Sequence, residues 1–172
     1  MALIALVLVP LTVGVALLAT GESLTRRAAA VLAGAAGIVT LVLAVWVAVT
    51  RPEVDRAWLA ELGVRAHFGV DGIAIPLVLL TAGVGLLTIV HARSELPTGG
   101  SPSAFLGCLL LVEGGALATF TARDVVLFFI AFEIVLVPMW VLITRFGDRH
   151  QPAGRREAGH RFVLYTAAGS TL

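Results

Sequence analysis

The sequence contains no lysine, one cysteine and one tyrosine, and only 13% of its 172 residues are charged. All twelve cationic side chains are arginine, which does not readily deprotonate, so a proton relay within this chain must use carboxylates, histidine, tyrosine or water. The single cysteine, Cys108, lies in an apolar run and excludes a disulfide framework or a cysteine-ligated metal cluster. A net charge of +1 offers no basic field for nucleic acid.

Apolar residues, in contrast, make up 59% of the chain, and the mean hydropathy is +1.00. These values are typical of an integral membrane protein. We expect an all-α, multi-pass transmembrane bundle in which residues 1–172 form one membrane domain with five full spans and a truncated sixth. The expected spans cover residues 2–20, 28–49, 72–92, 103–122 and 125–144, and the incomplete sixth covers 160–172.

The connections between these spans are polar. Residues 50–70 carry charges of both signs around Trp58, which predicts a solvated or interfacial extramembrane loop without assigned chemistry. Asp71 stands where its side chain can cap the first turn of the third span. Because the last apolar segment stops after about two thirds of a span, we expect this chain to be a fragment of a longer protein.

The arginines indicate an orientation. The loops at 21–27, 93–102 and 145–159 hold seven of them, whereas those at 50–70 and 123–124 hold four. By the positive-inside rule, the sequence predicts that the N-terminus lies outside.

Two lone carboxylates, Glu113 and Glu133, interrupt the fourth and fifth spans on either side of the short Arg123-Asp124 turn. At about 1.5 Å per residue, both lie about 12 to 14 Å from that turn, level with each other near the membrane midplane. An ionisable group at this depth costs about 2.5 to 3.5 kcal/mol on insertion scales and is read as functional. We therefore predict that both residues handle protons or ions, and carboxylates within reach of each other would titrate as a pair. The alternative is that each is protonated and only hydrogen-bonds across the bundle.

Three further residues are candidate auxiliary members of this site. Pro138, five residues after Glu133, can kink its helix and shape a water-accessible cavity. His91 and His160 lie near the inner ends of their spans, where imidazole can pass protons between water and the midplane. A packing kink and interfacial anchoring are the structural alternatives.

Four stretches carry a resemblance to a known family: FGVDG at 68–72, LLLVEGG at 109–115, FFIAFEIVLVPM at 128–139 and FVLYTAAGS at 162–170. Together they resemble the N-terminal portion of subunit M of bacterial respiratory complex I, the proton-translocating NADH:quinone oxidoreductase, whose mitochondrial counterpart is subunit four. In the first two spans the resemblance is one of topology alone.

The resemblance implies an antiporter-like, non-redox subunit of the bacterial plasma membrane that couples quinone reduction to proton transport. It would hold no cofactor or metal, because flavin, iron-sulfur clusters and quinone belong to partner subunits. Its partners would be the other membrane subunits, the lipid bilayer and protons.

The resemblance also assigns roles to residues. The fifth-helix glutamate of the family, here Glu133, pairs with a lysine on a later helix, and the fourth-helix glutamate, here Glu113, is an auxiliary member. Those lysines would lie beyond Leu172, and Arg161 stands where relatives commonly carry lysine. We therefore expect the isolated fragment to be inactive in pumping.

Two alternatives stay open. The multi-subunit sodium/proton antiporters of the Mrp type contain a related D-type component that uses the same acidic helix. A truncated, non-transporting membrane scaffold would need neither glutamate for transport.

Overall fold

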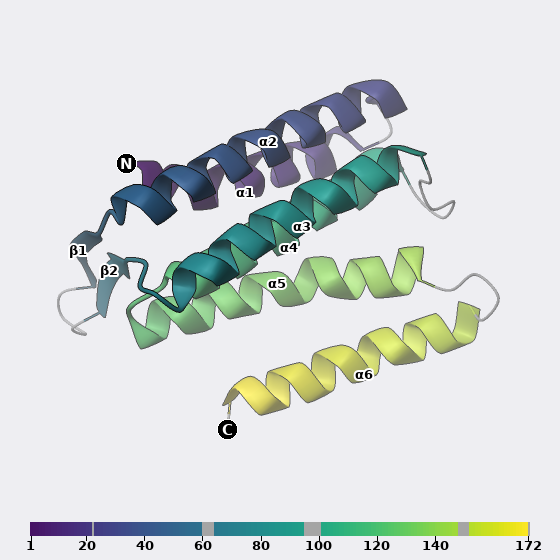
Figure 1. The fold of residues 1–172 in the computed structure, drawn as a ribbon. Coiled ribbons are helices and arrows are strands. Elements are labelled where there is room, and N and C mark those ends of the chain that lie inside the picture. Colours follow the sequence, from purple (N-terminus) through teal and green to yellow (C-terminus); the bar gives the residue numbers. More distant parts are fainter. Residues whose placement is uncertain (22, 60–63, 95–100, 148–151, 172) are drawn as a thin grey trace.

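The computed structural model describes residues 1–172 except 22, 60–63, 95–100, 148–151 and 172. Six helices lie alongside one another, and a two-stranded hairpin covers one end of the bundle (Figure 1). The helices are α1 (Ala2–Thr20), α2 (Arg26–Thr50), α3 (Ala74–Ser94), α4 (Pro102–Thr121), α5 (Val125–Phe146) and α6 (Pro152–Thr171). The hairpin pairs β1 (Val54–Leu59) with β2 (Val64–Phe68) in antiparallel orientation.

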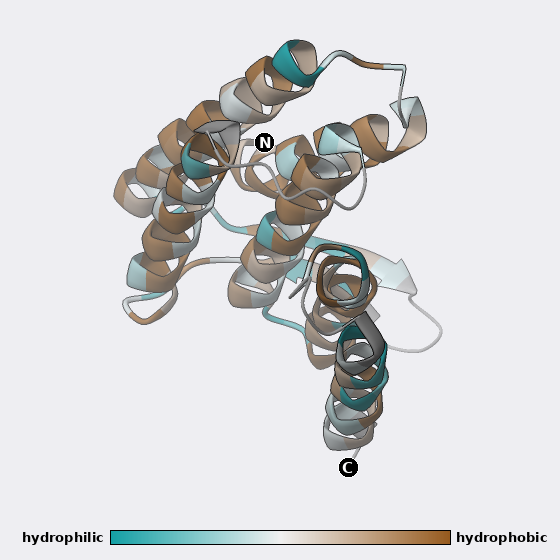
Figure 2. Ribbon diagram, turned by 90° about the vertical axis from the view of Figure 1, so that its right-hand side faces the viewer, coloured by the Kyte–Doolittle hydropathy of each residue, from teal (hydrophilic) through white to brown (hydrophobic). Residues whose placement is uncertain are grey.

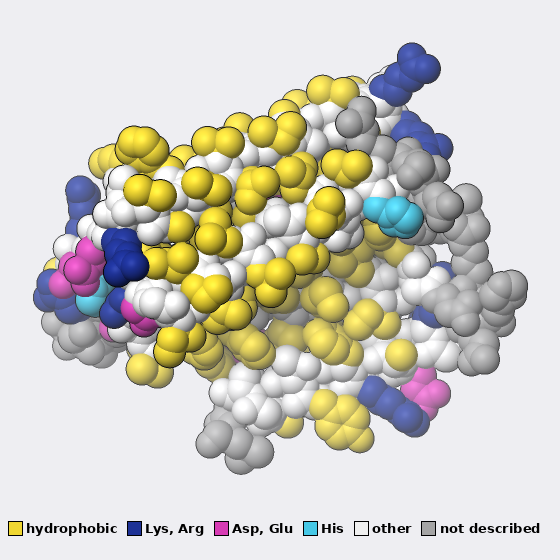
Figure 3. Space-filling view, viewed as in Figure 1, with side chains coloured by type: hydrophobic (Ala, Val, Ile, Leu, Met, Phe, Trp, Pro, Cys, Tyr) yellow, Lys and Arg dark blue, Asp and Glu magenta, His cyan; other side chains and the backbone are white. Residues whose placement is uncertain are grey.

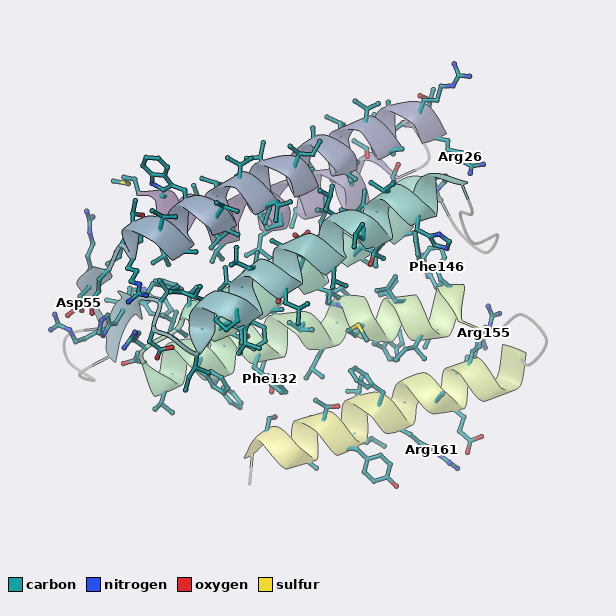
Figure 4. All side chains as sticks on the ribbon, viewed as in Figure 1. Arg26, Asp55, Phe132, Phe146, Arg155 and Arg161 are labelled. Atoms are coloured by element: carbon teal, nitrogen blue, oxygen red, sulfur yellow. The ribbon has the colours of Figure 1, made fainter. Side chains whose placement is uncertain are left out.

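The helices α1 to α5 are each long and apolar enough to cross a membrane, which confirms the expected multi-pass helical fold. Apolar residues cover most of their length (Figure 2), and charged side chains gather mainly toward the two ends of the bundle (Figure 3). Figure 4 labels Asp55 at the hairpin end, and Arg26, Phe146 and Arg155 toward the opposite end. This distribution is the one that a hydrocarbon layer around the middle of the bundle requires.

The sixth helix begins at Pro152, earlier than the predicted start at 160. Hydropathy detects only apolar residues, whereas the first turns of α6 carry Arg155, Arg156 and Glu157, which are good helix formers. Proline at the first position of a helix is also favourable, because the missing N–H has no partner there in any case.

The segment expected as a loop at 50–70 contains the hairpin. Its strands place Asp55 opposite His67 and Ala57 opposite Arg65. The Arg65 guanidinium donates two hydrogen bonds to the carboxylate of Asp55, at 2.7 and 2.9 Å, and so lowers the pKa of that carboxyl. A search for apolar spans overlooks such short strands because they mix apolar and charged residues.

The hairpin is fixed to the turn between α4 and α5. The backbone N–H of Arg123 donates to the carbonyl of His67 at 2.9 Å, and that of Gly69 donates to the carbonyl of Thr121 at 2.8 Å. The Arg123 side chain lies 3.7 Å from Asp71. These contacts tie the start of α3 to the turn that connects the two glutamate-bearing helices.

Side chains cap the starts of α3 and α5. Asp71 accepts hydrogen bonds from the N–H groups of Ile73 and Ala74, which confirms its expected role. Asp124 accepts from those of Val126 and Leu127, and both aspartates consequently have pKa values below the ordinary one. For Asp124 the largest cause is the N–H of Leu127.

The centre of the bundle is α4, which contacts α1, α2, α3 and α5. Its approach to α1 is especially close, since a Cβ added to either Gly14 or Gly107 would lie 2.9 Å from the carbonyl oxygen of the other glycine. Any residue larger than glycine at either position would push these two backbones apart.

We expect Asp124→Asn to lower the midpoint of thermal unfolding in lipid nanodiscs at neutral pH, with a smaller effect in acid. Asparagine retains the cap but not the charge. Because the folded pKa of Asp124 is below the unfolded value of about 3.9, its stabilisation is present above that pH. The stabilisation is then lost as the pH falls through the folded pKa.

Asp124→Ala, which also removes the cap, should unfold at a lower temperature than Asp124→Asn at every pH. A gap between wild type and Asp124→Asn that stays constant below about pH 4 would contradict the assignment.

Candidate functional site

The carboxyl group of Glu113 lies in the interior of the bundle between α4 and α3. The residue is only 4% exposed, and neither carboxyl oxygen has a hydrogen-bond partner among the residues that the structure describes. Across from it is Gly85 of α3, so close that an added Cβ would lie 2.7 Å from Cδ of Glu113. The glycine thus leaves the space that the carboxyl group occupies.

A pocket of about 360 Å³ adjoins this carboxyl group. Residues of α3 and α4 form its walls: Leu80, Thr81, Val84, Gly85, Thr88, Leu109, Val112, Glu113 and Ala116. Apart from the glutamate, the polar side chains are those of the two threonines. Glu113 therefore lies at the base of a pocket with few polar groups, which opens to the surface beside the exposed residues Leu80 and Val84.

Glu133 lies on α5 and faces α6. Its Oε1 accepts a hydrogen bond from the Oγ of Ser170 at 2.8 Å, and its side chain is partly buried. It lines a larger pocket of about 680 Å³ with Leu136, Val137, Trp140, His160, Val163, Leu164 and Ala167. Glu133 thus has a hydroxyl partner and access to a cavity.

The two glutamates are level, as predicted, but they do not face each other. Glu113 is eight residues before Thr121 at the end of α4, and Glu133 is eight residues after Val125 at the start of α5. Gly115, about 200° around α4 from Glu113, packs closely against Val135 of α5. Each carboxyl group consequently lines a separate pocket, and a directly hydrogen-bonded pair does not form.

A third pocket, of about 420 Å³, lies between these two. It shares Val112 and Ala116 with the pocket of Glu113, and Leu136 with the pocket of Glu133. Its other lining residues come from α4, α5 and α6: Thr119, Phe120, Phe132, Val135, Met139, Phe162 and Thr166. An apolar chamber therefore separates the two carboxyl groups.

The auxiliary candidates occupy different places. His160 shares the pocket of Glu133, and its ring stacks on Trp140 with centroids 6.5 Å apart. Pro138 is buried inside α5, which continues past it to Phe146. His91 is exposed near the end of α3 and lines none of the three pockets described above.

Sequence reasoning missed Gly85, Ser170 and Trp140. The stretch from 81 to 88 contains Gly83 and Gly85, but small residues in a span more often serve helix packing, so nothing in the sequence connected either one with Glu113. Ser170 belongs to a stretch that carries the family resemblance, yet its partner is 37 residues away in the sequence.

No family model matches the sequence. NAD(P)H-quinone oxidoreductase chain 4 1 of Microcystis aeruginosa is 35% identical over 113 residues, which are 66% of this chain and 20% of that protein. The protein of the same name from Synechococcus elongatus is 36% identical over 143 residues, or 80% of this chain and 26% of that protein.

Among solved structures, a chain of respiratory complex I from Thermus thermophilus with bound NADH matches with a TM-score of 0.80 and 30% identity. The match covers 99% of this chain and 33% of that one. The chain thus spans about a quarter or less of the curated relatives named above and a third of the solved chain. Over this part of their length, the chain is a homologue of NAD(P)H-quinone oxidoreductase chain 4, which confirms its resemblance to the antiporter-like subunits of complex I.

Proposed function

We propose that the chain is an antiporter-like, proton-translocating membrane subunit of NADH:quinone oxidoreductase, in which quinone reduction elsewhere is coupled to proton transport. The observation that carries the proposal is the position of Glu133. It lies at the middle of an apolar helix, accepts a hydrogen bond from Ser170, and lines a pocket together with His160. The names of the relatives support the assignment to this complex.

In this proposal Glu133 is the central titratable group. Ser170 orients its carboxyl group, and the pocket between α5 and α6 leads from Glu133 toward His160, about 15 Å along α6 from Ser170. With the N-terminus outside, His160 lies on the inner side. Protons would thus reach Glu133 from the inner surface through the α5–α6 pocket.

Glu113 has an auxiliary role. Its carboxyl group loads a proton on the α3 side, and the apolar chamber between the pockets keeps the two glutamates from exchanging protons freely. In this proposal the apolar pocket gates transfer by its degree of hydration, as apolar segments of channels do. Charge shifts that accompany quinone reduction would change which carboxyl group is protonated.

The chain would lie in the bacterial plasma membrane with other complex I subunits, which would hold the flavin, iron-sulfur clusters and quinone. It has no lysine, so the lysine that the family pairs with Glu133 would come from outside residues 1–172, and the isolated chain would not pump. Co-purification with iron-sulfur and flavoprotein subunits tests this placement. A purely membranous assembly would favour the sodium/proton antiporter instead.

We expect Glu133→Gln to abolish coupled proton movement and Glu113→Gln to reduce it without abolishing it. Glutamine keeps the size of each side chain but cannot release a proton. The measurement is quinone-dependent acidification in vesicles that contain the assembled complex. Glu157→Gln is the matched control, because Glu157 is 62% exposed on α6 and lines neither pocket. Wild-type pumping by Glu133→Gln would refute the assignment.

We also expect Ser170→Ala to slow proton transfer at Glu133. Loss of one hydrogen bond costs about 1 kcal/mol, which corresponds to about a fivefold decrease in rate if the bond is needed in the transferring state. Ser170→Thr retains the hydroxyl group and should keep most of the activity. Equal rates for the alanine and wild-type forms would show that this hydrogen bond does not position the carboxyl group for transfer.

A further inference from the structure

The contact between Gly85 and Glu113 leaves no room for a side chain at position 85 unless the flexible carboxyl end of Glu113 moves. A Cβ on Gly85 would lie 2.7 Å from Cδ of Glu113, and 2.8 and 3.0 Å from its two carboxyl oxygens. All three distances are at or below the closest approach that real side chains show. Even alanine would therefore displace the carboxyl group.

The same carboxyl group lacks a hydrogen-bonding partner within the chain as described. Both of its oxygens are buried, and neither accepts or donates a hydrogen bond to a described residue. A buried polar group without a partner costs about 1 to 3 kcal/mol, and more if it is charged. Something outside these side chains must satisfy it.

The adjoining pocket can hold water. Its volume is about 360 Å³, far above the about 10 to 15 Å³ that a cavity needs to hold one water molecule. The hydroxyl groups of Thr81 and Thr88 donate to the carbonyls of Leu77 and Val84, both at 2.8 Å. Because these donors are used, the two hydroxyl oxygens remain as acceptors for water that also bonds Glu113.

The spacing of these residues places them on one face of α3. Thr81, Gly85 and Thr88 follow each other at intervals of four and three, which is the spacing of one helical face. The two threonines stand about 6 Å before and about 4.5 Å after the glycine along the helix axis. The two threonines thus flank Gly85 along α3 and line the same pocket as the carboxyl group of Glu113.

We propose that this pocket is a water-binding proton-exchange site, with Glu113 as its titratable member and Gly85 as its positioning residue. The proton leaves the carboxyl oxygen of Glu113 for a bound water molecule and returns by the reverse step. This proposal adds detail to the proposed function, and its role in proton transport rests on that function. The site is separate from the α5–α6 pocket, so Glu113 exchanges protons on the α3 side.

The test is infrared spectroscopy of the native membrane assembly that carries this chain, with exchange into heavy water. The carboxyl band that disappears in Glu113→Gln identifies the group. In the wild type we expect a hydrogen-bonded carboxyl band that shifts rapidly in heavy water. In Gly85→Ala the band should move to the frequency of a non-bonded carboxyl, and the exchange should slow by about tenfold or more.

Matched variants distinguish a loss of carboxyl positioning at Glu113 from a general disturbance of the helix packing. Gly83→Ala lies on the same helix, where an added Cβ meets nothing within 4 Å, and should behave as wild type. Glu113→Asp shortens the side chain by one methylene, so combined with Gly85→Ala it should restore rapid exchange. If Gly85→Ala does not assemble, the Thr81→Val and Thr88→Val double variant, of similar shape, should slow exchange through loss of the acceptors.

Three results would overturn the proposal. They are exchange in Gly85→Ala as fast as in Gly83→Ala, exchange that does not respond to removal of both threonine hydroxyls, and the absence of a protonated carboxyl band across the pH range. The last would mean that a cationic group from another segment or subunit occupies the pocket. The infrared readout does not depend on pumping. If Glu133→Gln pumped like the wild type, the proposed function would be refuted, but the proton exchange of Glu113 could still be measured and interpreted.

Discussion

The close approach of backbones around α4 is the constraint on which the site depends. Gly107 meets Gly14 of α1, Gly115 meets Val135 of α5, and Gly85 of α3 receives the carboxyl group of Glu113. Since apolar burial provides little drive between helices in a lipid environment, such packing and its polar contacts hold the bundle together. Of these small residues, Gly85 leaves the space into which the carboxyl group of Glu113 points.

The depth of the two glutamates is determined by the turn that connects α4 to α5. Asp124 ends the turn after α4 and begins α5, while backbone hydrogen bonds from Arg123 and Gly69 hold the hairpin against this turn. The turn cannot slide relative to the helices, so eight residues on either side of it bring the carboxyl groups to one level. The charged hairpin, distant from the chemistry, thereby contributes to the geometry of the site.

Hydropathy was sufficient to predict the apolar spans from the sequence, because a bilayer requires long apolar helices and leaves few alternatives. It was insufficient for the hairpin and for the polar first turns of α6, where hydrogen bonding and helix propensity decide the structure. For the site, the spacing around Arg123-Asp124 predicted the common depth of Glu113 and Glu133. The direction in which the side chains of Glu113 and Glu133 point could not be predicted from the sequence. It depends on contacts with Gly85 and Ser170, which are distant in sequence.

Separate pockets do not make the glutamates electrically independent. Helices in contact lie about 8 to 10 Å apart, and side chains pointing to opposite sides would place two charges roughly 15 Å apart, where they repel by about 1 kcal/mol at an effective dielectric constant of about 20. A change of charge at one glutamate would therefore alter the electrostatic energy at the other, although the two carboxyl groups share no pocket. Because the chamber between them is apolar, the charge of one site can influence the other while the protons themselves stay apart.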